Sequence, residues 1–147
     1  MTYSTPLRET DRAFTQLRWA TILFAVALIT HGADHLRRGM NTVSSTVMTL
    51  GTIQMILALA TIVLVFLGHR AAPLAAIVIG FVSAAGFILV HLFPDWFGPL
   101  SDSFINPPES AKVNGFSWFA ALFEIAADVI IGVAGLRAYR TQAGTRS

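Results

Sequence analysis

Residues Ser45–Leu67, STVMTLGTIQMILALATIVLVFL, decide the fold of this chain. They contain no Asp, Glu, Lys or Arg, and neither does the rest of the stretch between Arg38 and Arg70. A helix needs roughly 20 mostly apolar residues to cross a bilayer. The segment is therefore predicted to be a membrane-spanning helix.

The composition of the whole chain agrees with a membrane protein. Of its 147 residues 54% are hydrophobic and only 12% are charged, whereas about 25% are charged in an ordinary soluble domain. So few charges exclude a disordered chain and argue against a soluble globular domain. The net charge of +2 comes without a basic block, so we expect no nucleic-acid partner. There is no cysteine, and hence no thiolate metal site.

Two further spans lie on either side of this segment. Residues 73–93 form one, because Pro73 suits the first turn of a helix and Pro94 ends it. Residues 19–37 form the other, but they reach span length only if polar residues at their C-terminal end are included. The arginines before this apolar run also resemble the start of a signal peptide, but the context for cleavage is poor, which favours a retained span.

The last span, residues 116–136, contains two acidic residues, Glu124 and Asp128. With it the sequence predicts an all-α fold, a four-transmembrane-helix bundle that forms one membrane domain. The expected spans are 19–37, 45–67, 73–93 and 116–136, with an outer loop at 94–115.

Four spans place both termini on one side of the membrane. That side then carries most of the basic residues, namely Arg8, Arg12, Arg18, Arg70, Arg137, Arg140 and Arg146. Basic residues favour the cytoplasmic side, so we expect cytoplasmic termini. Arg37 and Arg38 would lie on the outer side against this rule, so we expect them to have local partners. The candidates are Asp34, Asp95, Asp102 and Glu109.

The outer loop, residues 94–115, is the longest connection and contains Trp96, Phe97 and Phe104. Aromatic residues are enriched at membrane interfaces, where they act as anchors. Anchoring is the favoured interpretation of these three side chains. The alternative is that they cap the helix bundle.

Small and polar residues recur at helical spacing on one side of each span, where helices in membranes pack against one another. In the last span they are Ser117, Ala121, Glu124, Asp128, Gly132 and Gly135. Close packing explains the small residues but not the acids, because an acidic residue near the middle of a membrane costs roughly 2.5–3.5 kcal/mol. Ionisable residues in spans usually mark ion paths, proton relays or cofactors.

His31 and His35 are spaced i, i+4 and therefore share one face of a helix, as in helical metal sites. His91 offers a third imidazole from another span. At 1.5 Å per residue, His31 lies about 9 Å and Glu124 about 12 Å below the outer edge, so both occupy the outer half. His31, His35, His91 and Glu124 are thus candidate ligands of zinc or non-haem iron.

Other polar residues of the spans have candidate roles around such a site. Asp34, Gln54 and Arg38 are candidates for orienting the ligands. Asp128 is a candidate base beside Glu124, which makes these two the expected catalytic residues if the protein is an enzyme. The sequence lacks the HExxH motif of zinc proteases and the four carboxylates of di-iron bundles.

Each of these residues also has an alternative interpretation. A histidine pair, His31 or His35 with His91, is also suited to holding a haem. His35 alone can pair with an interfacial acid. Glu124 and Asp128 can form a structural lock with Arg37, Arg38 or His31, and a glutamine such as Gln54 more often makes an interhelical hydrogen bond than a substrate contact.

The segments HGADHLRRG, VHLFPDWFGPLSD and SWFAALFEIAADVIIGVAG resemble small uncharacterised four-helix bacterial integral membrane proteins. The resemblance covers most of the chain. It implies a four-helix membrane architecture and a bacterial inner-membrane location, and it implies no activity.

Three functions are compatible with the sequence. The first is a metal-binding membrane protein with the metal in the outer leaflet, and an enzyme is one form of this function. The second is an accessory subunit of a larger membrane complex or a homo-oligomer. The third is a proton or cation transporter, which the scarcity of polar residues in the inner half disfavours.

Overall fold

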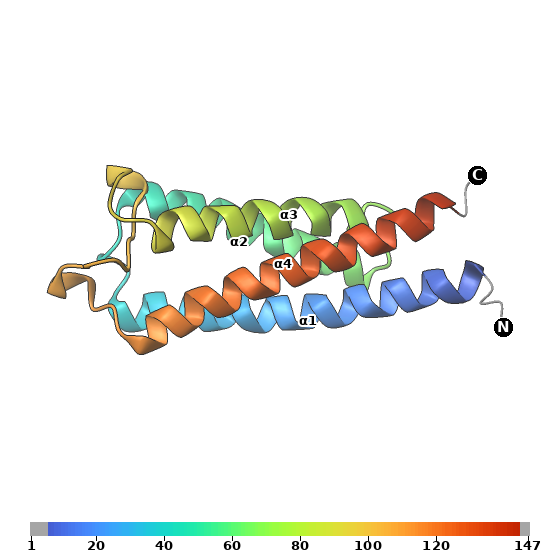
Figure 1. Ribbon diagram of the computed structural model, residues 1–147, viewed down its shortest axis with the longest axis horizontal. Coiled ribbons are helices and arrows are strands. Elements are labelled where there is room, and N and C mark those ends of the chain that lie inside the picture. The colour runs from blue at the N-terminus through green and yellow to red at the C-terminus, as the bar shows by residue number, and fades with distance from the viewer. Residues whose placement is uncertain (1–5, 145–147) are drawn as a thin grey trace.

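The computed structural model describes residues 6–144, with side chains described from Glu9 onward, and within that part the chain is all-α. Its four long helices are α1 (Pro6–Arg38), α2 (Ser45–Phe66), α3 (Ala72–Phe87) and α4 (Gly115–Gly144). Figure 1 shows them as an elongated bundle. The short elements are a π-helix, η1 (Ile88–Leu92), and two 3₁₀ turns, η2 (Gly98–Leu100) and η3 (Glu109–Ala111). The all-α prediction is confirmed.

By length and composition, four helices are long and apolar enough to cross a membrane, with η1 extending the third of them to Leu92. Two helices are longer than the predicted spans, since α1 begins at Pro6 and α4 continues to Gly144. Hydropathy marks the apolar part of a helix, whereas packing decides where the helix ends. In the extensions, Ala13 and Leu17 of α1 and Ala138 of α4 are buried in the common hydrophobic core.

The helices differ in how extensively they pack against one another. α4 packs extensively on α1 and α3, whereas α2 contacts α3 and only a few residues of α1. The contact of α3 with α4 depends on glycine, because a Cβ on Gly80 would lie 2.5 Å from the carbonyl oxygen of Asp128 and 2.8 Å from the Cα of Gly132. Small residues allow such close approach between helices in membranes.

The predicted inward face of α4 is confirmed. All six residues of that stripe are buried, namely Ser117, Ala121, Glu124, Asp128, Gly132 and Gly135. The opposite side carries Leu122 and Val129, which are exposed on the protein surface as expected for residues that face lipid. The acids of α4 are therefore inside the bundle.

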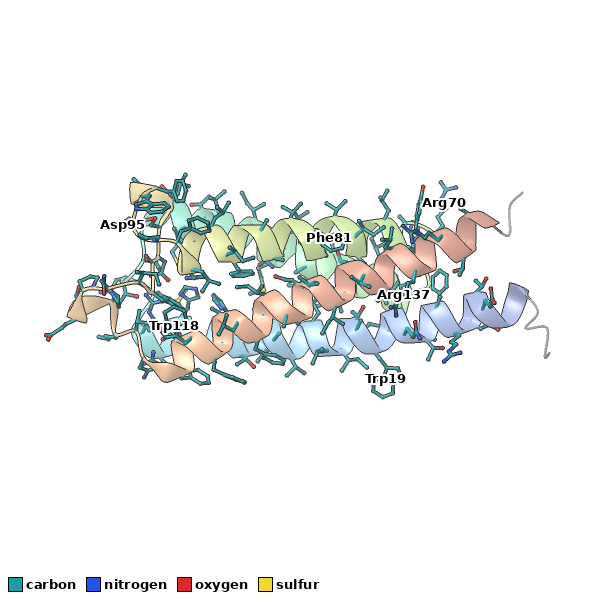
Figure 2. All side chains as sticks on the ribbon, in the orientation of Figure 1. Trp19, Arg70, Phe81, Asp95, Trp118 and Arg137 are labelled. Atoms are coloured by element: carbon teal, nitrogen blue, oxygen red, sulfur yellow. The ribbon has the colours of Figure 1, made fainter. Side chains whose placement is uncertain are left out.

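The N-terminal end of α1 and the C-terminal end of α4 lie at one end of the bundle, and the loop of residues 94–114 lies at the other (Figure 1). Figure 2 places Arg70 and Arg137 toward the end with the termini and Asp95 at the loop end. This arrangement agrees with an even number of spans. Which side of the membrane holds the termini stays a prediction, and of the arginines that support it, Arg146 and the side chain of Arg8 lie outside the described residues.

Candidate metal centre

Two of the three candidate histidines sit one turn apart near the C-terminal end of α1. Because residues i and i+4 of a helix lie on the same face, His31 and His35 both point toward α3. Their Nε2 atoms are 3.1 Å apart, and the two rings meet edge to face with centroids 4.8 Å apart. His31 is buried, whereas His35 is half-buried.

The third histidine, His91, lies in the π-helix η1 that continues α3. π-helical turns are rare and often occur at functional sites. The His91 ring stacks on Phe87 and packs against Phe104, with centroids 5.9 and 4.6 Å away. Its Nδ1 is 3.0 Å from the carbonyl oxygen of Asp102. A carbonyl oxygen only accepts, so Nδ1 carries the proton and Nε2 keeps its lone pair for another partner.

These three imidazoles form a group that could hold a metal ion, because one ligand nitrogen from each lies within 4.8 Å of the others. Zinc binds imidazole nitrogens at about 2.0–2.1 Å in a tetrahedron, which places neighbouring nitrogens about 3.3 Å apart. His31 and His35 already have this spacing. The corresponding ligand nitrogen of His91 lies within 4.8 Å of both.

The loop of residues 94–114 holds His91 through a buried ion pair. The guanidinium of Arg38 donates to both carboxylate oxygens of Asp102, at 2.7 and 2.5 Å, and its Nε donates to the carbonyl oxygen of Ala111 at 2.8 Å. Arg38 is 0% exposed and lies 5.3 Å from the centroid of Phe104. The fixed Asp102 presents its carbonyl to His91, so Arg38 acts on the candidate ligand through the loop.

The local partners expected for Arg37 and Arg38 are confirmed. Arg38 pairs with Asp102, and Arg37 donates to Asp34 at 2.8 Å. Arg37 also donates to Ser117 and to the carbonyl oxygen of Lys112, so it links α1 to the start of α4. These pairs explain why two arginines are found at the loop end of the bundle.

The aromatic residues of the loop divide between the two roles considered for them. Phe104 is buried and packs against His91 and Trp118, so it caps the bundle. Trp96 and Phe97 are exposed, as interfacial anchors would be. Figure 2 shows Trp118 at the loop end of the bundle, and it shows Trp19 projecting outward from the middle of the molecule.

Glu124 and Asp128 are both 0% exposed, in the face of α4 that packs against α1 and α3. Within residues 6–144, none of their four carboxylate oxygens has a hydrogen-bond partner. The interpretation of these acids as a structural lock with Arg37, Arg38 or His31 is therefore wrong, because neither acid bonds to any of the three. The group of converging ligand atoms consists of the three histidines and does not include Glu124.

The three residues predicted to orient the ligands have different neighbours. Asp34 accepts from Arg37 and Ser117, Gln54 donates to Ser83 across a distance of 3.3 Å, and Arg38 reaches His91 only through Asp102. In the part of the chain that the structure describes, Nδ1 of His31 and Nδ1 of His35 have no hydrogen-bond partner. Only His91 thus has the kind of acceptor that usually orients a metal-bound imidazole.

Sequence reasoning missed the functions of Asp102 and Phe104. Asp102 was identified only as one of several acids near the arginines, and Phe104 as one of several loop aromatics. No spacing rule connects a loop residue to His91. The contacts of Asp102 and Phe104 with His91 are therefore visible only in the tertiary structure.

All three histidines also line one cavity of about 580 Å³ between α1, α2 and α3. Its other walls are mostly aliphatic, with Leu28, Met48, Ile53, Ile79 and Val82 among them. The cavity includes Gln54 and Ser83, but neither Glu124 nor Asp128. The candidate metal centre therefore borders a mostly apolar space that the two acids do not line.

No protein-family model, no curated protein and no solved structure matches this chain. The function is therefore argued from the arrangement of these residues.

Proposed function

We propose that this protein is an integral membrane protein that binds one divalent metal ion, zinc or iron, through His31, His35 and His91. The observation that carries the proposal is the convergence of three imidazole nitrogens within 4.8 Å of one another inside an apolar helix bundle. Imidazole is a good ligand for both metals. Burying three polar imidazoles in an apolar bundle costs free energy. Binding one shared ion compensates that cost.

Three protein ligands leave one coordination position open, as is typical of catalytic zinc sites, which complete a tetrahedron with water or substrate. We propose a site that can polarise a bound oxygen atom. Glu124 and Asp128 are the proposed acid–base residues, supported by their complete burial and their lack of partners within the described residues. The assignment of Glu124 as a fourth ligand stays a prediction.

The experiment is elemental analysis of the protein purified without chelators and reconstituted in lipid nanodiscs. We expect about one metal ion per chain in the wild type, and loss of the ion in His31→Ala and His91→Ala with the helix content retained. His69→Ala is the matched control, because His69 is exposed between α2 and α3 and lies outside the cluster. A metal-free wild type after incubation with zinc and with iron would refute the proposal.

The same samples decide the role of Glu124. If its carboxylate is a ligand, Glu124→Gln loses the metal as His31→Ala does. If it acts on protons, Glu124→Gln keeps the metal. A visible spectrum of the same preparation tests the haem alternative, which the gathering of three imidazoles at one point disfavours, because a haem takes its two axial ligands from opposite faces of a flat ring.

A second candidate, the transport of protons or a cation, is supported by the unpartnered acids of α4. We expect such a path to involve Asp128, so flux through proteoliposomes that is unchanged in Asp128→Asn would count against it. The accessory-subunit interpretation would gain if the ionisable groups of the bundle were all paired. However, Glu124 and Asp128 have no hydrogen-bond partner within the described residues.

The location follows as a further proposal. We infer a bacterial plasma membrane with both termini in the cytoplasm, supported by the arginines near the end of the bundle that carries the termini. Association into a homo-oligomer or a larger complex stays a prediction.

A further inference from the structure

The cavity beside the histidines exists because α2 stands away from α1 and because glycines line the gap. Gly32, Gly51 and Gly86 come from three different helices and all border the cavity. A Cβ added at any of them would meet nothing within 4 Å. The space is thus a consequence of missing side chains on the facing surfaces of the helices.

The size of the cavity suits a small molecule. Its volume of about 580 Å³ falls within the range of about 300–1,000 Å³ that is usual for ligand pockets. Most of its lining is aliphatic or methionine, including Met40 and Met48, whose unbranched side chains adapt to irregular shapes.

Polar groups are unevenly distributed along the cavity. The three imidazoles lie at its end near the loop, where α1 ends and η1 begins. The other polar side chains of the lining are Thr52, Gln54 and Ser83. Thr52 donates to the carbonyl oxygen of Met48 in its own helix, and Gln54 and Ser83 bond to each other. Gln54 lies about 14 Å along α2 from Ser45. A ligand that matches this wall has one polar head and a long apolar body.

Charge identifies the head group. Three neutral imidazoles leave both positive charges of a divalent ion uncompensated, and the converging group contains no carboxylate. A charge buried in an apolar interior is costly unless it is paired. An anionic oxygen donor, such as a carboxylate, compensates the charge and fills the open coordination position.

We propose that the cavity binds a long-chain fatty acid, with its carboxylate on the metal held by His31, His35 and His91 and its chain along α2 and α3. This inference rests on the metal centre proposed above. The chain would lie against Met48, Val82 and Val90, and Gly51 and Gly86 would leave room for it.

The first test uses the protein in lipid nanodiscs loaded with Co²⁺, whose visible absorption reports a change of ligand. We expect palmitate to shift the spectrum at concentrations at which acetate does not. Gly86→Leu and Gly51→Leu each place a side chain in the cavity and leave the three histidines in the sequence. Both should keep the metal and weaken the palmitate response about tenfold or more, because the added side chain occupies the space of the acyl chain.

Gly115→Leu is the matched control, because Gly115 has open space around it but lies outside the cavity. It should respond to palmitate as the wild type does. Palmitate enters the bilayer equally in every variant, so the comparison isolates binding in the cavity. Having the filling substitution on two different helices guards against one variant that fails to fold.

The second test does not depend on the metal spectrum. A palmitate that carries a diazirine in its chain should label wild-type peptides around Met48 and Val82, and Gly86→Leu should reduce this labelling. If Co²⁺ binds but the spectrum and the labelling are the same in wild type and in both filled variants, the fatty-acid inference is wrong and the metal centre stands. If the wild type binds no Co²⁺, the proposed function and the inference both fail.

Discussion

Among the candidate ligands, His91 has the orientation that the chain fixes most completely. The carbonyl of Asp102 holds its Nδ1, Phe87 and Phe104 pack against its ring, and Arg38 holds Asp102. His31 and His35 instead touch each other through Nε2. A metal ion that binds here would find one ligand already placed, and it would replace the contact between the other two.

The ion pair that fixes His91 gives a first prediction. Asp102→Asn leaves Arg38 buried without its carboxylate, and breaking a buried ion pair costs about 3–5 kcal/mol. We expect the free energy of unfolding in bicelles to fall by about that amount, and metal affinity to fall about 10–100-fold, as when a group that orients a ligand is lost.

The double variant Arg38→Met/Asp102→Leu separates the two effects. Replacing both charges by apolar side chains restores most of the stability, because no buried charge is left unpaired. Metal affinity should recover only in part if the ion pair also fixes the position of the loop. An Asp102→Asn protein as stable as the wild type would show that the pair contributes little to holding the loop.

At the scale of elements, the loop of residues 94–114 is part of the bundle as well as a connection. Phe104→Ala removes a buried ring from contact with His91, Arg38 and Trp118, so we expect a loss of about 3–5 kcal/mol in the free energy of unfolding. Trp96→Ala is the control in the same loop, because Trp96 is 68% exposed. Equal effects of the two substitutions in chemical unfolding would contradict the distinction between cap and anchor.

The contact of α3 with α4 gives a prediction about two glycines in one helix. Gly80→Ala places a Cβ 2.5 Å from the backbone oxygen of Asp128, so the helices must move apart. We expect a destabilisation of about 1–3 kcal/mol. Gly86→Ala, six residues further along, meets no atom within 4 Å and should leave stability unchanged.

Steric-trap measurements of unfolding in bicelles would compare the two glycine variants directly. If both substitutions are neutral, then α3 and α4 do not rely on close backbone approach for their packing.

The elements could be predicted from the sequence as far as hydropathy determines them. The predicted spans agree to within a few residues with α2 and with α3 continued by η1, because a glycine follows the first apolar segment and a proline follows the second. The π-helix that carries His91 was not predicted, because its hydrogen-bond pattern depends on how Asp102 and the loop pack against it. The same holds for the early start of α1, which tertiary packing at Leu17 explains.

At the scale of the whole molecule, the candidate site was predicted in part. The spacing of His31 and His35 fixed their common face, and depth placed His91 at a similar level. What depth could not supply is the rotation of each helix about its axis. That rotation places Glu124 outside the group of converging ligand atoms, and it places the glycines that form the cavity opposite one another.

The orientation of the bundle in the membrane gives the last prediction, and the absence of cysteine makes it simple to test. Ser110→Cys lies in the exposed part of the loop and Ala143→Cys at the exposed end of α4. If the arginines at the terminal end keep that end in the cytoplasm, an impermeant maleimide added to intact cells labels Ser110→Cys at once. Ala143→Cys is labelled only after the membrane is permeabilised, because no route through the apolar bundle reaches it. The opposite pattern would place the histidine cluster in the inner half of the membrane, and its proposed ligand would then have to enter from the cytoplasmic leaflet.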